Sequence, residues 1–232
     1  FIDQGYTELA DYMNAYAQKM VMKREVLADK AIWTAKKRYV INVHNSEGVQ
    51  YAKPKVKVMG LEMVKSSTPA VIRDQLRDSL QVILHGSESD LHRYVREFKA
   101  KFEKMPVEEI AFPRSCNGIK HYAGSPIYTK GAPIQVRAGL LFNHHCKRHG
   151  IENKYQPIRD GDKIKFVYLR TPNPIHEDVI AFTTELPKEL GLHAYIDYDK
   201  QFEKVFLDAL QIVIEPLGWK TQEESSLKDF FE

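Results

Sequence analysis

Polar and apolar residues alternate with a period of two along residues 20–59, which predicts β-structure. Tyr39–Val43 and Val49–Ala52 flank Asn45-Ser46-Glu47-Gly48, a stretch typical of a hairpin turn. Pro54 interrupts the pattern, which then resumes. Further short strands are expected at Val21–Val26 and Lys55–Met59. Together these segments predict a small antiparallel sheet.

Apolar residues recur at helical spacing elsewhere in the chain, first over residues 3–19. Pro69 is placed for the first turn of another helix, with Ser67 or Thr68 as its cap, and His85-Gly86-Ser87 ends that helix. The later pattern predicts helices at 91–102, 134–149 and 198–217 and strands at 163–169 and 179–182.

The change of pattern near residue 65 divides the chain into residues 1–64, residues 65–220 and a polar tail, 221–232. The expected fold class is α+β, a small antiparallel sheet followed by a mainly helical domain. No apolar run approaches the roughly 18 residues of a membrane span, and no signal peptide is visible. Cys116 and Cys146 do not suggest a disulfide framework. We therefore expect a cytoplasmic protein with no membrane partner.

The net charge of +3 conceals an uneven distribution of basic residues. Residues 19–65 hold eleven basic and four acidic side chains, a net charge of +7, whereas residues 199–232 carry −4. A basic segment of this kind favours a polyanionic partner. The alternative is a solvated, lysine-rich sheet edge that deters aggregation.

The densest charge lies at Lys36-Lys37-Arg38-Tyr39, where three cations precede an aromatic ring at the start of a predicted strand. Charge of this density on a rigid element suits a phosphate backbone. This motif resembles the primer-gripping motif of family B DNA polymerases. Other markers follow in the expected order: Tyr12-Met13-Asn14, Gly60-Leu61-Glu62, Lys65-Ser66-Ser67-Thr68-Pro69, Arg137-Ala138-Gly139 and Leu227-Lys228-Asp229-Phe230-Phe231.

The whole chain is therefore similar to the C-terminal part of the T-even, cyanophage-like type of these bacteriophage polymerases. The resemblance implies that residues 1–64 complete the palm and that residues 65–220 form the thumb, which grips primer–template duplex DNA. It implies primer-strand contacts for Lys36, Lys37, Arg38 and Tyr39. A lysine there can donate to minor-groove acceptors that all base pairs share.

Lys65, Ser66, Ser67 and Thr68 lie beside a predicted helix N-terminus, where unpaired N–H groups attract a phosphate. By resemblance they contact the DNA backbone; the alternative is an ordinary helix cap. In the tail, Leu227, Phe230 and Phe231 fall on one side of a helical turn. They resemble the peptide that docks phage polymerases into the sliding clamp. The alternative is a tail that folds back onto its own domain.

The metal-binding aspartates that such a polymerase needs are not found in the chain. Asp197-Tyr198-Asp199 imitates their motif, but its position predicts a helix N-cap instead. We expect no catalytic residue and no bound metal here, with Mg²⁺ held only by the complete enzyme. The isolated chain should be inactive, as a truncated or split gene product that needs the catalytic N-terminal part.

Two other functions remain open at this point. The chain could be a clamp-docking module that does not bind DNA. It could also be a zinc-dependent enzyme built on His145 and His149, with Cys146 nearby and Cys116 as a further ligand.

Overall fold

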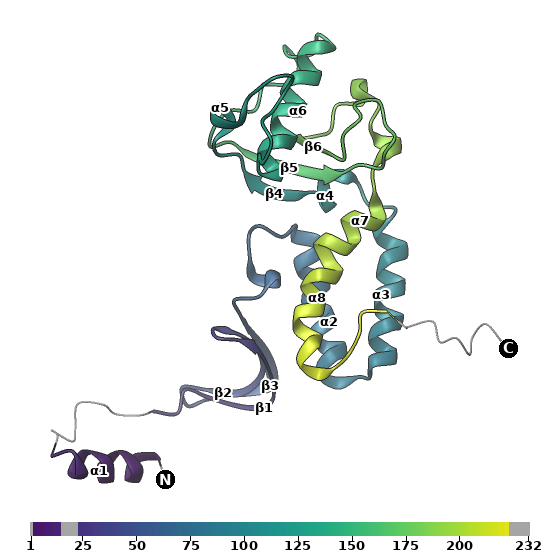
Figure 1. Ribbon diagram of the computed structural model, residues 1–232. Helices are drawn as coiled ribbons and strands as arrows, with labels where there is room; N and C mark the ends of the chain where they lie inside the picture. Colours follow the sequence, from purple (N-terminus) through teal and green to yellow (C-terminus); the bar gives the residue numbers. More distant parts are fainter. Residues whose placement is uncertain (1, 15–22, 223–232) are drawn as a thin grey trace. The chain divides into compact units, whose positions relative to one another are not determined.

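The computed structural model describes residues 2–14 and 23–222, and these fall into two compact units (Figure 1). The smaller unit comprises Phe1–Ile32 and Val40–Lys57; the larger comprises Trp33–Tyr39 and Val58–Glu232. Each unit has apolar residues buried within it. None of the helices in the described ranges is long and apolar enough to cross a membrane.

The first sheet has the strand order β1-β2-β3. β1 spans Val26–Ala35, β2 spans Arg38–Ser46 and β3 spans Val49–Met59. Only two residues join each strand to the next, and connections this short are possible only between antiparallel strands. The predicted antiparallel sheet is therefore confirmed. Its first strand begins at Val26, so the strand predicted at Val21–Val26 is wrong over residues 23–25, and residues 21 and 22 lie outside the described residues.

β2 is the central strand, and four consecutive side chains in it are buried: Val40, Ile41, Asn42 and Val43. Burial on both faces removes the strict alternation of apolar and polar residues. Asn42 is accommodated because its side-chain amide donates to Asp29 Oδ1 at 2.8 Å.

The predicted turn between β2 and β3 is confirmed. Its two central residues, Glu47 and Gly48, both have positive φ, at 50° and 87°, as a type I′ turn requires. Asn45 Oδ1 accepts a hydrogen bond from the Gly48 N–H at 3.2 Å. Pro54 does not interrupt β3, contrary to expectation. β3 lies at the sheet edge, where a missing N–H donor is tolerated.

Helix α1 spans Ile2–Tyr12, so the helix expected over residues 3–19 is confirmed only in its first part. Residues 15–19 lie outside the described residues.

Three helical segments of the larger unit pack side by side (Figure 1). α2 spans Ala70–His85 and α3 spans Glu88–Phe102, close to the predicted ranges. The third segment runs from α7, Tyr198–Phe202, through a π-helical turn to α8, Asp208–Ile214. Between α3 and this segment lies a cluster of buried aromatic rings: Phe98, Phe102, Phe202 and Phe206.

A second antiparallel sheet, of order β4-β5-β6, lies in the same unit. β4 spans Phe112–Ser115, β5 spans Lys163–Tyr168 and β6 spans Val179–Phe182. The long helix α6, Ile134–Arg148, packs against β6, while the short helices α4, Val107–Ile110, and α5, Ile119–Tyr122, lie nearby (Figure 1). The α+β class is thus confirmed, with a second sheet inside the part expected to be mainly helical.

Buried Gln201 joins the helical segments to the second sheet. Its amide nitrogen donates to the Ile110 carbonyl at 2.7 Å, and its amide oxygen accepts from the Tyr168 N–H at 3.2 Å. Because both ends of the amide are satisfied, this polar side chain fixes the end of β5 against α7 without an unpaired buried group.

Candidate nucleic-acid interface

The basic motif spans the turn between β1 and β2 and the first two residues of β2, so the predicted start of a strand at this motif is confirmed. Lys36 and Lys37 are the two connecting residues, and β2 begins at Arg38. All three cationic side chains are exposed, whereas Tyr39 is half-buried. Thr34 Oγ1 donates to the Arg38 carbonyl across the turn at 3.3 Å. The hairpin therefore presents three positive charges to solvent at its tip.

Gly60 allows the chain after β3 to pass directly against this turn. A Cβ atom on residue 60 would overlap the carbonyl oxygen of Lys37 and lie 3.1 Å from Arg38 Cγ. Gly60 also has a φ of +69°, which side chains rarely adopt. Glycine at this position thus has a physical cause, because the backbone of the basic turn lies where a side chain would be.

Trp33 is a surface residue of the same hairpin that the sequence analysis did not select. It lies on β1, and 67% of its surface is exposed. Basic side chains interspersed with an exposed aromatic ring suit a nucleic acid, because the ring can pack on a sugar or base. The sequence did offer a signal for this residue, because Trp33 is an aromatic residue just before the basic run that starts at Lys36.

The four predicted phosphate contacts at residues 65–68 do not share one environment. Lys65 Nζ pairs with Glu62 Oε1 at 2.5 Å, and Thr68 Oγ1 donates to Glu62 Oε2 at 3.3 Å. Thr68 is buried, whereas Ser66 is exposed and Ser67 half-buried. Glu62 therefore bonds the side chains of Lys65 and Thr68, whereas the hydroxyls of Ser66 and Ser67 bond no other group in the described residues.

The alternative assignment of Ser67 or Thr68 as a helix cap is wrong. The residue that precedes α2 is Pro69, and no side chain caps this helix. Thr68 is drawn to the Glu62 carboxylate instead. Ser67 is held through its backbone, because Arg114 Nη1 donates to the Ser67 carbonyl at 2.5 Å.

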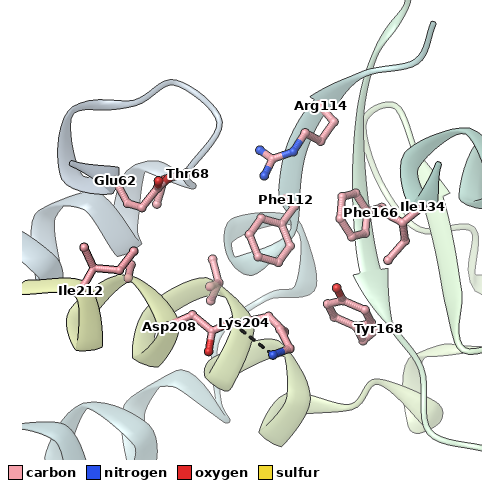
Figure 2. Close-up of a pocket in the computed structure, with 12 residues that line it drawn as sticks. Glu62, Thr68, Phe112, Arg114, Ile134, Phe166, Tyr168, Lys204, Asp208 and Ile212 are labelled. Carbon is pink, nitrogen blue, oxygen red and sulfur yellow. Dashed lines mark hydrogen bonds and ion pairs between the residues drawn. The ribbon is translucent and has the colours of Figure 1, made fainter. Parts of the chain in front are cut away.

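A cavity of about 350 Å³ lies between these residues, the second sheet and α8 (Figure 2). Figure 2 shows Arg114 extending from β4 toward the loop that carries Glu62 and Thr68. Phe112 and Phe166 stack with their ring centres 5.2 Å apart. The acidic and basic side chains of this cavity already bond protein groups, including Lys204 with Asp208 at 3.1 Å. The cavity therefore presents paired charges rather than a net positive surface.

Two curated proteins resemble the chain over almost its whole length. It is 33% identical to the DNA-directed DNA polymerase of Enterobacteria phage T4 over 242 aligned positions, which cover 99% of the chain. It is also 33% identical to the DNA-directed DNA polymerase of Escherichia phage RB69, with 100% of the chain covered. The chain is thus similar to the C-terminal portion of T4-like phage DNA polymerases.

The chain spans only about a quarter of either relative, 26% and 27% of their lengths. No protein-family model matches it.

The two aspartates of Asp197-Tyr198-Asp199, which imitate a metal-binding motif, have structural partners. Asp197 Oδ1 accepts from the Lys200 N–H at 2.9 Å, which confirms the predicted N-cap. Asp199 Oδ1 lies 2.7 Å from Lys99 Nζ, and its carboxylate raises the pKa of that lysine. Both carboxylates thus serve the start of α7.

The four candidate zinc ligands are not brought together. Cys116 lies against Gly139 and Gln135, in the first half of α6. His145 follows Gly139 by six residues, about 9 Å along a helix. Burial raises the pKa of both Cys116 and Cys146 to about 11. Within residues 2–14 and 23–222, no three His, Cys, Asp or Glu side chains gather as a metal site would require.

The predicted clamp-binding residues, Leu227, Phe230 and Phe231, lie outside the described residues. Their role stays a prediction.

Proposed function

We propose that this chain grips primer–template duplex DNA for a family B replicative polymerase of a bacteriophage. Residues 1–64 would complete the palm, and residues 65–220 would form the thumb. The observation that carries the proposal is the exposed turn Lys36–Lys37, fixed against Gly60, in a chain similar to phage DNA polymerases. A solvent-facing cluster of three cations on a hairpin provides the charge that a DNA backbone attracts.

The hairpin tip is assigned to the primer strand near its growing end. Lys36 and Lys37 would donate to acceptors in the minor groove, which every base pair presents in similar places. Arg38 would bind a backbone phosphate, for which its planar guanidinium is suited. The half-buried Tyr39 would hold the hairpin in place beneath this contact, and exposed Trp33 would pack on a sugar.

The segment 65–68 is assigned to a backbone phosphate beside the hairpin. Ser66 and Ser67 would donate directly, since their hydroxyls bond no other group in the described residues. Lys65 would contribute charge from its ion pair with Glu62. Thr68 would act through Glu62, because its hydroxyl already donates to that carboxylate.

Catalysis is assigned to protein outside this chain. The Mg²⁺ ions and their aspartates would belong to the N-terminal part of the polymerase, so this chain alone would be inactive. Exposed Leu27 and Val49 in the smaller unit offer apolar surface that such a partner could cover. The complete enzyme would act inside the infected bacterium.

The tail is assigned to the sliding clamp, with Leu227, Phe230 and Phe231 as apolar anchors. This tether would keep the polymerase on DNA between nucleotide additions.

The proposal is tested by titrating the chain with primer–template duplex at several salt concentrations. The double variant Lys36→Gln/Lys37→Gln should bind about tenfold more weakly, with a salt slope smaller by roughly 2, because two cations that release counterions from the duplex are removed. Lys120→Gln/Lys188→Gln is the matched control, since both lysines are exposed and distant in sequence. Equal affinity of the two double variants would contradict the proposal and leave a clamp-docking module as the better account.

A further inference from the structure

Two hydroxyls of the segment 65–68 line a groove whose opposite wall comes from the second sheet. The groove has a volume of about 230 Å³, far more than the roughly 30 Å³ of one water. Ser66 and Ser67 lie on one side and the paired strands β4 and β5 on the other. All of its lining residues belong to the larger unit.

The second-sheet wall adds a third hydroxyl and a cation. Ser115 of β4 and Lys163 of β5 are directly opposite partners in the antiparallel register, so their side chains lie on the same face. Lys165, two residues further along β5, is also on this face. Its ammonium group donates to the Glu108 carbonyl at 2.8 Å. The side chain of Lys163, by contrast, is exposed and bonds no other group within the described ranges.

The charged residues that line the groove favour the binding of an anion. None of the seven described residues that line it is acidic, and two of them, Arg114 and Lys163, are cationic. The nearest acid in sequence, Asp162, is engaged elsewhere, because its carboxylate accepts from the Arg159 N–H at 2.7 Å. The side-chain hydroxyls of Ser66, Ser67 and Ser115 donate to no other group in the described parts of the chain.

Arg114 holds the two walls together. Its Nη1 donates to the Ser67 carbonyl at 2.5 Å and to the Pro113 carbonyl at 3.0 Å. The guanidinium thus fixes the segment 65–68 against β4 and leaves a positive charge beside the groove. Arg114 is a positioning residue here, since two carbonyls already occupy its Nη1.

We propose that Ser66, Ser67, Ser115 and Lys163 form a binding site for one phosphodiester of the DNA backbone. Three hydroxyl donors and an ammonium group around a groove that lacks acids match the acceptor oxygens and charge of a phosphate. This inference rests on the proposed function, which supplies the DNA, and adds Ser115 and Lys163. Because the site joins the segment 65–68 to the second sheet, a bound phosphate would hold both at one point of the duplex.

The test compares Lys163→Gln and Ser115→Ala with Lys188→Gln in salt-dependent titrations with primer–template duplex. Lys163→Gln should bind roughly threefold to tenfold more weakly and lower the salt slope by about 1, since one phosphate contact loses its charge. Ser115→Ala should weaken binding less and leave the slope unchanged. Lys188→Gln removes the same charge from an exposed residue outside the groove and should change neither quantity.

A second measurement identifies the phosphate. A series of duplexes is prepared, each with a single uncharged methylphosphonate at a different backbone position. The affinity of each duplex is measured for the unaltered chain and for Lys163→Gln. At one backbone position the methylphosphonate should lower the duplex affinity of the unaltered chain. At that same position it should not lower the affinity of Lys163→Gln any further. Equal losses at every position would overturn the site.

The Lys36→Gln/Lys37→Gln variant in the same titration separates the two proposals. If that variant loses affinity and Lys163→Gln does not, the groove is no phosphate site and the proposed function stands. If neither loses affinity, the proposed function fails and this inference fails with it.

Discussion

Buried polar residues show most directly how single side chains constrain this protein. His145 on α6 is only 5% exposed, and its Nε2 has no hydrogen-bond partner among the described residues. Burial lowers its pKa from 6.5 to about 4, and the neighbouring His144, Arg148 and His149 add to the effect. The imidazole is therefore neutral in the folded protein at neutral pH.

This burial predicts a loss of stability in mild acid. The unfolded chain takes up a proton near pH 6.5, whereas folded His145 does so only near pH 4. Unfolding free energy should therefore fall as the pH drops from 6.5 to 4, by at most about 3 kcal/mol, and no further through this group. Urea unfolding at pH 7, 5.5 and 4 measures the change.

The matched variants for this experiment are His145→Gln and His121→Gln, the second being an exposed histidine. His145→Gln should flatten the pH dependence of unfolding, and His121→Gln should leave it as in the unaltered chain. A pH profile that is the same in all three proteins would show that His145 is not the group responsible.

At the scale of elements, the spacing of apolar residues was sufficient to predict a helix where only one face of that helix is buried. α2, α3 and α6 were predicted within a few residues, because each has apolar residues on one side only. The hairpin at Glu47–Gly48 was predicted from its turn chemistry. These features depend on neighbours in sequence, which is why the sequence reveals them.

Elements that depend on distant partners were missed. β4 has four residues including Pro113, and it is a strand only because β5 pairs with it. The π-helical turn at Glu203–Leu207 interrupts a regular apolar pattern that gave no sign of it. Likewise, Glu62 rather than α2 determines where the Thr68 hydroxyl points, and the Lys163 contribution to the groove depends on strand register.

The position of the basic turn yields a prediction at this scale. Gly60→Ala would place a methyl group against the Lys37 carbonyl, so the turn must move. Duplex affinity should fall toward that of Lys36→Gln/Lys37→Gln even though no charge is removed. The salt slope should change less, because all three cations remain.

Gly131→Ala is the control for backbone strain in that experiment. Gly131 also has a positive φ, +88°, but nothing lies within 4 Å of a Cβ there. Gly131→Ala should cost about 1 kcal/mol in unfolding free energy through strain alone. Gly60→Ala should cost more, because the overlap with the Lys37 carbonyl adds to the strain, and it alone should weaken DNA binding. Parallel losses of affinity in the two variants would mean that strain, rather than turn position, is responsible.

At the scale of the whole molecule, the two units differ in how much core each contains. The smaller unit buries few apolar side chains, among them Ile32, Val40, Ile41 and Val43. A small sheet with so little buried surface is marginal by itself. The larger unit buries the aromatic cluster of the helices and the apolar layer between α6 and the second sheet. Stability should therefore reside in the part of the larger unit that follows β3, whereas the basic hairpin tip, Trp33–Tyr39 of the same unit, adds binding.

A truncated chain of residues 58–222 tests this division of roles. It should keep cooperative unfolding and lose only the contribution of α1 to the helical circular dichroism of residues 1–222, because the core from Leu61 to Ile214 is built from its own side chains. Its duplex affinity should fall below that of Lys36→Gln/Lys37→Gln, since Arg38 and Trp33 are also lost. Residual binding should still depend on Lys163, because the groove remains whole. A truncated chain that unfolds, or that binds DNA as tightly as residues 1–222, would contradict the assignment of stability and grip to different parts of the chain.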